Sequence, residues 1–306
     1  MLSDALQTVL HLLVAFLLPP LLGGLIARTK AFVAGRVGPP LLQPYYDLAR
    51  LVRKGSVFSK TTTWVFKAGP VVSLASSMLA VLFIPLGAHG PLLGFSGDVL
   101  LLVYLFGLGR FFTASAALDT GSAFEGMGAA REVSFAALAE PAFFFGLLCL
   151  CRITGSFELG TMLGPQLGSA WIAASAPLAM VCVAWLIVLL VENSRVPFDD
   201  PRTHLELTMV HEVMVLDHSG PAFGLIQYGA ALKLQIYAAI LVRAALPITT
   251  GNALTDWLVF LAGLAALAIA IGLCESTLAR LKLTGIPKFL VGAGLASAFA
   301  VILLAR

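Results

Sequence analysis

Long apolar stretches alternate with short polar segments along the 306-residue chain, and this pattern predicts a membrane protein. An α-helix rises about 1.5 Å per residue, so roughly 20 consecutive apolar residues cross the hydrocarbon core of a bilayer. Eight stretches meet this length. We therefore expect an all-α, polytopic integral membrane protein whose single membrane domain covers residues 1–306. The predicted spans are 3–26, 66–88, 98–118, 131–153, 171–192, 225–247, 254–275 and 286–304.

The first stretch has two features of its own. Pro19 and Pro20 interrupt it, and because proline lacks an N–H group we expect this span to be kinked or unwound there. Asp4 is the only charge before Arg28, so no basic segment precedes the apolar run. We therefore expect a retained span and not a cleaved signal peptide.

Composition supports the membrane interpretation. Hydrophobic residues make up 59% of the chain and charged residues 11%, against about 25% charged residues in soluble domains. A water-soluble protein of this size has too little interior to bury so much apolar surface. We also find no internal repeat, which argues against an inverted-repeat transporter.

The basic residues predict the orientation. Most Lys and Arg side chains fall in the segments 28–65, 119–130, 193–224 and 276–285 or next to them, whereas the opposite loops hold few. Since cytoplasmic loops are enriched in Lys and Arg, these segments are expected on the cytoplasmic side and both termini on the other side. The expected location is the cell inner membrane. Nucleic-acid binding is excluded because the basic residues lie at span ends.

Two of the predicted cytoplasmic segments have helical character. In residues 41–54 apolar and charged positions alternate with helical spacing. In residues 201–216, Leu205, Met209, Val213 and Leu216 share one face of a helix. His204, Thr208, His211 and Glu212 fall on another face, so such a helix lies on the membrane or under a docked partner.

Six ionisable residues occur inside or at the ends of the predicted spans. An ionisable side chain at the centre of a bilayer costs at least about 2.5–3.5 kcal/mol, so each is a candidate functional group. All six approach the cytoplasmic half, which suggests a polar path from that face to the membrane centre and then sideways. The alternative is structural ion pairing, for instance of Lys233 with Glu140 or of Arg110 with an acid. The six are Arg110, Glu132, Glu140, Glu192, Lys233 and Glu275.

Other chemistry is not supported by the motifs. Cys149, Cys151, Cys182 and Cys274 lie in apolar segments without a CxxC pair, so we expect no iron–sulfur cluster in this chain. The segment HEVMV at 211–215 lacks the second histidine of a zinc-protease motif. The chain also lacks a P-loop, a GxSxG motif and a GxGxxG that opens a helix. We expect neither a metal site nor a catalytic residue here.

Three polar stretches resemble a known family. They are residues 35–51, 118–132 and 191–200, which read GRVGPPLLQPYYDLARL, LDTGSAFEGMGAARE and VENSRVPFDD. They resemble subunit 1 of respiratory NADH dehydrogenase (complex I) and the related membrane subunits of energy-converting group 4 NiFe hydrogenases and formate hydrogenlyase. The hydrogenase branch is more similar, because its members share the LDTGS run, the Glu140-Pro141 pair and Glu275 followed by Ser-Thr-Leu-Ala-Arg.

The resemblance implies roles for particular residues. Charged positions of the family's acidic channel correspond to Arg131, Glu140 and Glu192, and we hypothesise a proton relay made of Glu140, Glu192, Glu275, Glu132, Lys233 and Arg131. The expected partner-interface residues are Arg36, Gln43, Asp47, Arg195, Asp199, Asp200, His204, Glu206, His211 and Glu212. Complex I has a run of glutamates where this chain has only Glu206 and Glu212, and this difference weakens the case for quinone chemistry.

The resemblance also implies partners and cofactors. We expect hydrogenase large and small subunits and an iron–sulfur subunit on the cytoplasmic face, with antiporter-like subunits alongside in the lipid bilayer. The NiFe site and the iron–sulfur clusters would lie in these partners, with no cofactor in this chain. The chain would then anchor the complex and couple electron transfer to proton or sodium translocation. The alternatives are a quinone-reducing complex I subunit, a purely structural anchor and a stand-alone secondary transporter.

Overall fold

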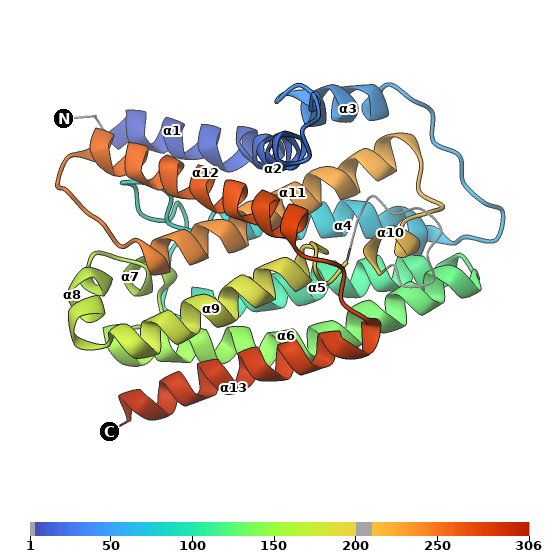
Figure 1. Cartoon of the computed structure of the whole chain (residues 1–306). Helices are drawn as coiled ribbons and strands as arrows, with labels where there is room; N and C mark the ends of the chain where they lie inside the picture. Colours follow the sequence, from blue (N-terminus) through green and yellow to red (C-terminus); the bar gives the residue numbers. More distant parts are fainter. Residues whose placement is uncertain (1–3, 200–209, 306) are drawn as a thin grey trace.

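The computed structural model describes residues 4–199 and 210–305, and it shows an elongated bundle of helices (Figure 1). Within these described residues, seven helices are long and apolar enough to span a membrane, or eight spans are present if one bent pair counts as a single span. The predicted all-α, polytopic fold is confirmed. The long helices are α4 (Trp64–Val81), α5 (Asp98–Asp119), α6 (Ala123–Thr154), α9 (Ser175–Glu192), α11 (Gly220–Ala245), α12 (Ala253–Thr277) and α13 (Ile286–Leu304), and the bent pair is α1 (Asp4–Leu17) with α2 (Pro19–Val33).

The expected break at the two prolines is present. Helices α1 and α2 meet at an angle of 53°. Pro19 and Pro20 cannot donate to the carbonyls one turn earlier, which are therefore left free at the break. Tyr228 of α11 donates its hydroxyl to the Phe16 carbonyl at 2.7 Å, and the Tyr45 hydroxyl donates to the Leu17 carbonyl. Side chains from neighbouring elements thus bond to two carbonyls at the break, and one of these, that of Phe16, lacks its helical partner because Pro20 has no N–H group.

The shorter helices lie in the connecting segments. The helical character of residues 41–54 is confirmed by α3 (Gln43–Val52). Only the last part of the predicted helix 201–216 is described, and there α10 (His211–Met214) forms a single turn. Helix α6 begins well before the predicted span, so most of segment 119–130 is helical. The remaining short elements are α7 (Leu159–Met162), α8 (Gln166–Ala173) and the 3₁₀ turn η1 (Leu283–Gly285).

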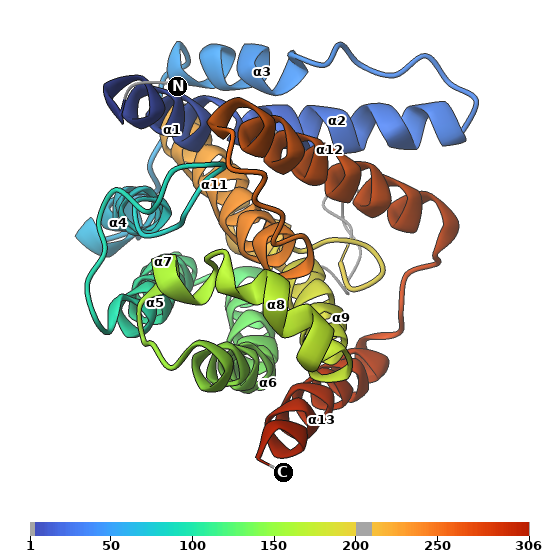
Figure 2. The same cartoon turned by 90° about the vertical axis from the view of Figure 1, so that its left-hand side faces the viewer.

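The bundle has two distinct ends. We call the end that carries segments 34–63, 193–199, 210–219 and 278–285 the basic end; it lies to the right in Figure 1. The described chain begins and ends at the opposite end (Figure 1), as an even number of spans requires. Figure 2 views the bundle from that opposite end and shows α13 at its periphery, against α6 and α9. Which end faces the cytoplasm stays a prediction.

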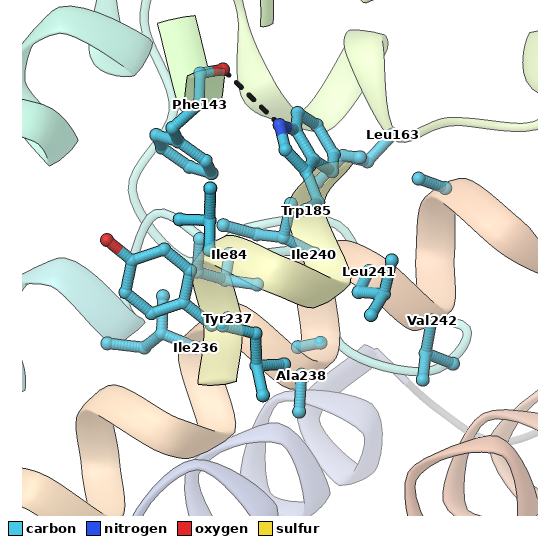
Figure 3. Close-up of a cluster of buried hydrophobic side chains, with 14 of the residues drawn as sticks. Ile84, Phe143, Leu163, Trp185, Ile236, Tyr237, Ala238, Ile240, Leu241 and Val242 are labelled. Atoms are coloured by element: carbon cyan, nitrogen blue, oxygen red, sulfur yellow. Dashed lines mark hydrogen bonds between the residues drawn. The ribbon is translucent and has the colours of Figure 1, made fainter. Parts of the chain in front are cut away.

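Buried side chains of α6, α9 and α11 pack together in the apolar core, part of which Figure 3 shows. Trp185 of α9 donates its indole N–H to the Phe143 carbonyl of α6 at 3.3 Å. A Cβ atom on Gly146 would stand 2.2 Å from that indole nitrogen, so only glycine permits this helix crossing. Tyr237 of α11 stacks on Phe106 with ring centres 5.0 Å apart. These rings form the apolar floor beneath a group of charged side chains.

Candidate functional site

A buried carboxylate joins three helices. Glu192 is the last residue of α9, and its side chain is only 3% exposed. Arg110 of α5 donates from Nη2 to Glu192 Oε1 at 2.9 Å and Oε2 at 2.8 Å. Lys233 of α11 places Nζ 2.7 Å from Glu192 Oε2. A buried carboxylate is stable in the ionised form when it is paired and hydrogen-bonded in this way.

Arg110 extends the group to a second acid. Its Nη1 atom donates to Glu140 Oε1 on α6, and the Glu140 side chain is 43% exposed. The expected pairing of Arg110 with an acid is therefore found, whereas Lys233 pairs with Glu192 and not with Glu140. We refer to Arg110, Glu140, Glu192 and Lys233 as the charge network.

A cavity of about 80 Å³ adjoins the network on the side of the basic end. Because one water needs about 10–15 Å³ of such space, the cavity has room for several waters. Glu132 of α6 and His211 of α10 complete its polar wall, beside Arg110, Glu192 and Lys233. The cavity thus holds a third carboxylate and an imidazole next to the buried ion pairs.

The imidazole of His211, which lies in this wall, is neutral at neutral pH. Burial and, after it, the charge of Lys233 lower the pKa of His211 to about 4, and Asp199 opposes that shift. At neutral pH its imidazole therefore accepts and donates hydrogen bonds without adding a positive charge. Such a group can pass a proton between waters on its two sides.

A larger cavity of about 270 Å³ leads from there into the basic end. It shares Asn193, Ser194 and His211 with the smaller cavity, so the two adjoin at these residues. Ser194 has φ +50°, a left-handed conformation that costs a non-glycine residue energy and is common at functional sites. The other walls of the larger cavity come from α2, α3 and α11 and include Pro20, Leu48, Phe223 and Leu234.

Two carboxylates hold the segment that carries His211. Asp199 Oδ2 accepts the backbone N–H groups of Val210 at 3.1 Å and His211 at 3.3 Å, and Arg280 donates to Asp199 Oδ1 at 3.0 Å. At the other end of the segment Glu125, 1% exposed, accepts the N–H of Asp217 at 3.1 Å. The position of His211 is thus tied to α6 and to the segment after α12.

Glu275 belongs to a separate cluster. Its side chain is 1% exposed and lies 2.7 Å from Lys30 Nζ of α2 and 3.4 Å from Arg195 Nη1. Within residues 4–199 and 210–305 no hydrogen bond or ion pair joins Glu275 to the charge network. Arg131 is likewise placed elsewhere, donating to the Met127 sulfur at 3.1 Å. Of the predicted relay residues, Glu140, Glu192 and Lys233 therefore lie in the charge network, Glu132 lines the cavity beside it, and Glu275 lies in the separate cluster.

The predicted interface residues of the first loop lie at the basic end. Gln43 donates to Asp47 at 3.0 Å, and Arg36 is exposed. Arg195, Asp199, His211 and Glu212 occupy the segments just described. Three further predicted residues, Asp200, His204 and Glu206, lie outside the described residues.

Sequence reasoning did not assign site roles to Glu125, Lys30 and Arg280. Glu125 falls in a stretch that was predicted to be a loop, and the two basic residues were counted only for orientation. The described part of the chain holds no group of three or more His, Cys, Asp or Glu side chains placed to bind a metal ion.

Fold and site together define a multi-pass membrane protein with a buried ion network that borders a cavity. Comparison with known proteins gives the family: the chain belongs to the NADH dehydrogenase family, which it matches over residues 6–306. It is 30% identical over 303 residues to formate hydrogenlyase subunit 4 of Escherichia coli strain K12, with 97% of each chain covered. It is also 30% identical over 275 residues to hydrogenase-4 component C of that strain, with 87% of this chain and 85% of that one covered.

Comparisons with more distant proteins also give subunits of respiratory membrane complexes. An NADH-quinone oxidoreductase subunit of Neisseria meningitidis serogroup C / serotype 2a is 26% identical over 225 residues, covering 70% of this chain and 62% of the relative. A chain in the solved structure of the membrane-bound sulfane sulfur reductase, an archaeal respiratory membrane complex, has the same fold, with a TM-score of 0.80, 21% identity and 98% coverage of both chains. The predicted resemblance is confirmed, and the chain is a multi-pass inner-membrane subunit of a respiratory complex.

Proposed function

We propose that the chain is the membrane anchor and ion-coupling subunit of a complex I-like, membrane-bound NiFe hydrogenase. The observation that carries the proposal is Glu192, a buried carboxylate held between Arg110 and Lys233 and bordered by a cavity with room for water. The sequence identity to formate hydrogenlyase subunit 4 and hydrogenase-4 component C favours the hydrogenase type.

The network supports a coupling role through its charge balance. Glu192 keeps its negative charge because two cations lie within hydrogen-bond distance. If Lys233 moves away, the remaining desolvation cost favours proton uptake by Glu192 from the cavity waters. Return of Lys233 then expels the proton towards Glu140, which shares Arg110 and is 43% exposed. A conformational change at the basic end is thereby converted into proton movement.

The basic end supports the docking of electron-transfer partners. Apolar side chains stand exposed there: Val37 and Val57 in the segment 34–63 are 104% and 76% exposed, and Trp64 at the adjoining start of α4 is 70% exposed. Hydrogenase large and small subunits and an iron–sulfur subunit would cover them, and these partners would carry the NiFe site and the clusters. Their movement would reach His211 through Asp199 and Glu125, since these two carboxylates hold its segment. Antiporter-like subunits would receive the charge inside the membrane.

The first experiment is purification of the chain with its native partners, followed by assays of hydrogen evolution, nickel, iron and quinone. We expect nickel and hydrogen turnover. Coupled vesicles then test Glu192→Gln and Glu140→Gln, which should retain hydrogen evolution but lose ion translocation. Glu158→Gln at the opposite end is the matched control. Full ion translocation in both network variants would contradict the coupling role and indicate that the chain is a structural anchor.

A quinone-reducing complex is the second candidate, and the 270 Å³ cavity favours it. This cavity lies beneath the segment after α9 and is mostly apolar, as a quinone site requires. Bound quinone without nickel in the purified complex would replace the hydrogenase assignment. Ion transport by the chain alone in liposomes would instead indicate a secondary transporter.

A further inference from the structure

We propose that His11 and His89, at the end of the bundle opposite the basic end, bind a borderline divalent transition-metal ion such as Zn²⁺. The site is independent of the charge network and of the proposed function. Two observations carry it: a fully buried imidazole that has no hydrogen-bond partner among the described residues, and a second imidazole whose Nδ1 atom donates to a backbone carbonyl, so that its Nε2 atom carries the lone pair.

His11 lies on α1 and is 0% exposed. Among residues 4–199 and 210–305, neither of its ring nitrogens has a hydrogen-bond partner. An imidazole always presents at least one N–H, and leaving buried polar groups unpaired costs about 1–3 kcal/mol. Such a side chain indicates a ligand that the protein atoms do not supply.

His89, in the loop between α4 and α5, has the orientation of a metal ligand. Its Nδ1 atom is 2.7 Å from the Gly90 carbonyl, which can only accept, so Nδ1 carries the proton. The lone pair is then on Nε2, which lies 3.4 Å from the Thr8 hydroxyl on α1. Thr8 already donates to the Asp4 carbonyl at 2.9 Å, so it does not satisfy Nε2. A histidine that donates its second ring nitrogen to a backbone carbonyl is the usual arrangement around protein-bound zinc.

The two rings have the spacing that one tetrahedral ion requires. Their centres are 5.4 Å apart, with planes at 73°. A Zn–N bond of about 2.0–2.1 Å places each ring centre roughly 3.2 Å from the metal, which gives about 5.2 Å between the centres at the tetrahedral angle. Thr8 precedes His11 by three residues and therefore lies on the same face of α1.

The ligand chemistry selects the class of ion. Two neutral imidazoles suit Zn²⁺, Cu²⁺ or Ni²⁺, whereas Mg²⁺ and Ca²⁺ require oxygen ligands. Water fills the remaining positions, because His89 is partly exposed. Arg243 donates to the Gly87 carbonyl at 3.1 Å, and its nearby positive charge opposes a divalent cation. The ion is therefore exchangeable and removable by chelators, unlike a closed structural zinc.

The test uses the purified native complex. After treatment with a chelator, the complex is dialysed against Zn²⁺ at micromolar concentration, and zinc per complex is measured by mass spectrometry. Wild type, His11→Gln and His89→Gln are compared with His218→Gln, a buried histidine at the basic end. We expect each site variant to hold one zinc fewer than wild type and His218→Gln to hold the same number.

Equal zinc in wild type and His89→Gln overturns the proposal and leaves water as the occupant of the site. If His11→Gln fails to assemble, the His89→Gln variant still tests the proposal. His89 is half-buried, so its replacement leaves no cavity in the core. A second readout is protection of His89 from diethyl pyrocarbonate by Zn²⁺ in wild type. Protection that persists in His11→Gln would also count against the site.

Discussion

Lys233 Nζ and Glu192 Oε2 lie 2.7 Å apart, with side chains that are 21% and 3% exposed. Both side chains line the cavity of about 80 Å³, but the carboxylate is also held by two hydrogen bonds from Arg110, and the lysine side chain is the more exposed of the two. Of the two partners, Lys233 is therefore the one with room to move. The proposed coupling role predicts that the charge of Glu192 responds to such a movement.

Replacing Lys233 tests this relationship. Lys233→Met removes one of the two cations and leaves Glu192 buried with Arg110 alone, so we expect loss of ion translocation and a weaker fold. Breaking a buried pair costs about 3–5 kcal/mol. The double variant Lys233→Met with Glu192→Gln should recover part of the stability but not the translocation. Lys60→Met, on an exposed loop lysine, is the control. Heat-induced dissociation of the complex and vesicle acidification measure the two effects.

The attachment of the His211 segment to Asp199 gives a second prediction. Asp199→Ala removes the acceptor of two backbone N–H groups and the partner of Arg280, so coupling should fall while the helices stay assembled. Asp199→Asn keeps one acceptor oxygen and should retain an intermediate level of coupling. The ratio of ions moved to electrons transferred is the measurement. Identical ratios in all three proteins would show that this carboxylate does not position the segment.

A pair of glycines on α6 tests the packing of α10. A Cβ atom on Gly128 would stand 2.9 Å from the Val210 carbonyl and 3.1 Å from the Met214 side chain, whereas one on Gly126 meets nothing closer than 3.6 Å. Gly128→Ala should displace α10 and cost about 1–3 kcal/mol by overpacking. Gly126→Ala is the matched control and should be neutral or slightly stabilising. Thermal dissociation midpoints compare them, and equal midpoints would contradict the close contact.

The buried histidines outside the spans should make the folded protein less stable in acid. Burial lowers the pKa of His218 to about 4, and Asp217 opposes the shift. The ordinary value is near 6.5, so above that pH both folded and unfolded forms are neutral and His218 has no effect. Between about 6.5 and 4 the unfolded chain binds a proton that the folded chain does not, so stability falls as the pH falls.

His218→Phe should flatten this decline. The ring stacks on Phe66 at 3.9 Å, and phenylalanine can keep that contact. The midpoint of heat-induced dissociation is measured from pH 7 to pH 5 in wild type and variant. His211 contributes to the decline by the same mechanism, so a residual slope is expected. An unchanged slope in His218→Phe would refute the assignment.

Much of the architecture could be predicted from the chain alone. Apolar length determines where helices cross a bilayer, and the missing N–H groups of Pro19 and Pro20 determine the break between α1 and α2. The cost of burying charge marked Arg110, Glu140 and Glu192 as candidates. These are local properties of the sequence, and each holds whatever the neighbouring helices are.

Which charges meet was decided only by the tertiary structure. The long helices are apolar on nearly every side, so periodicity does not reveal which face packs on which neighbour. Lys233 therefore meets Glu192 instead of Glu140, and Glu275 joins Lys30 in a separate cluster. His11 and His89, far apart in sequence, come together because α1 packs beside the loop after α4. The sequence determined which groups are costly to bury, and helix packing determined which partners make that burial stable.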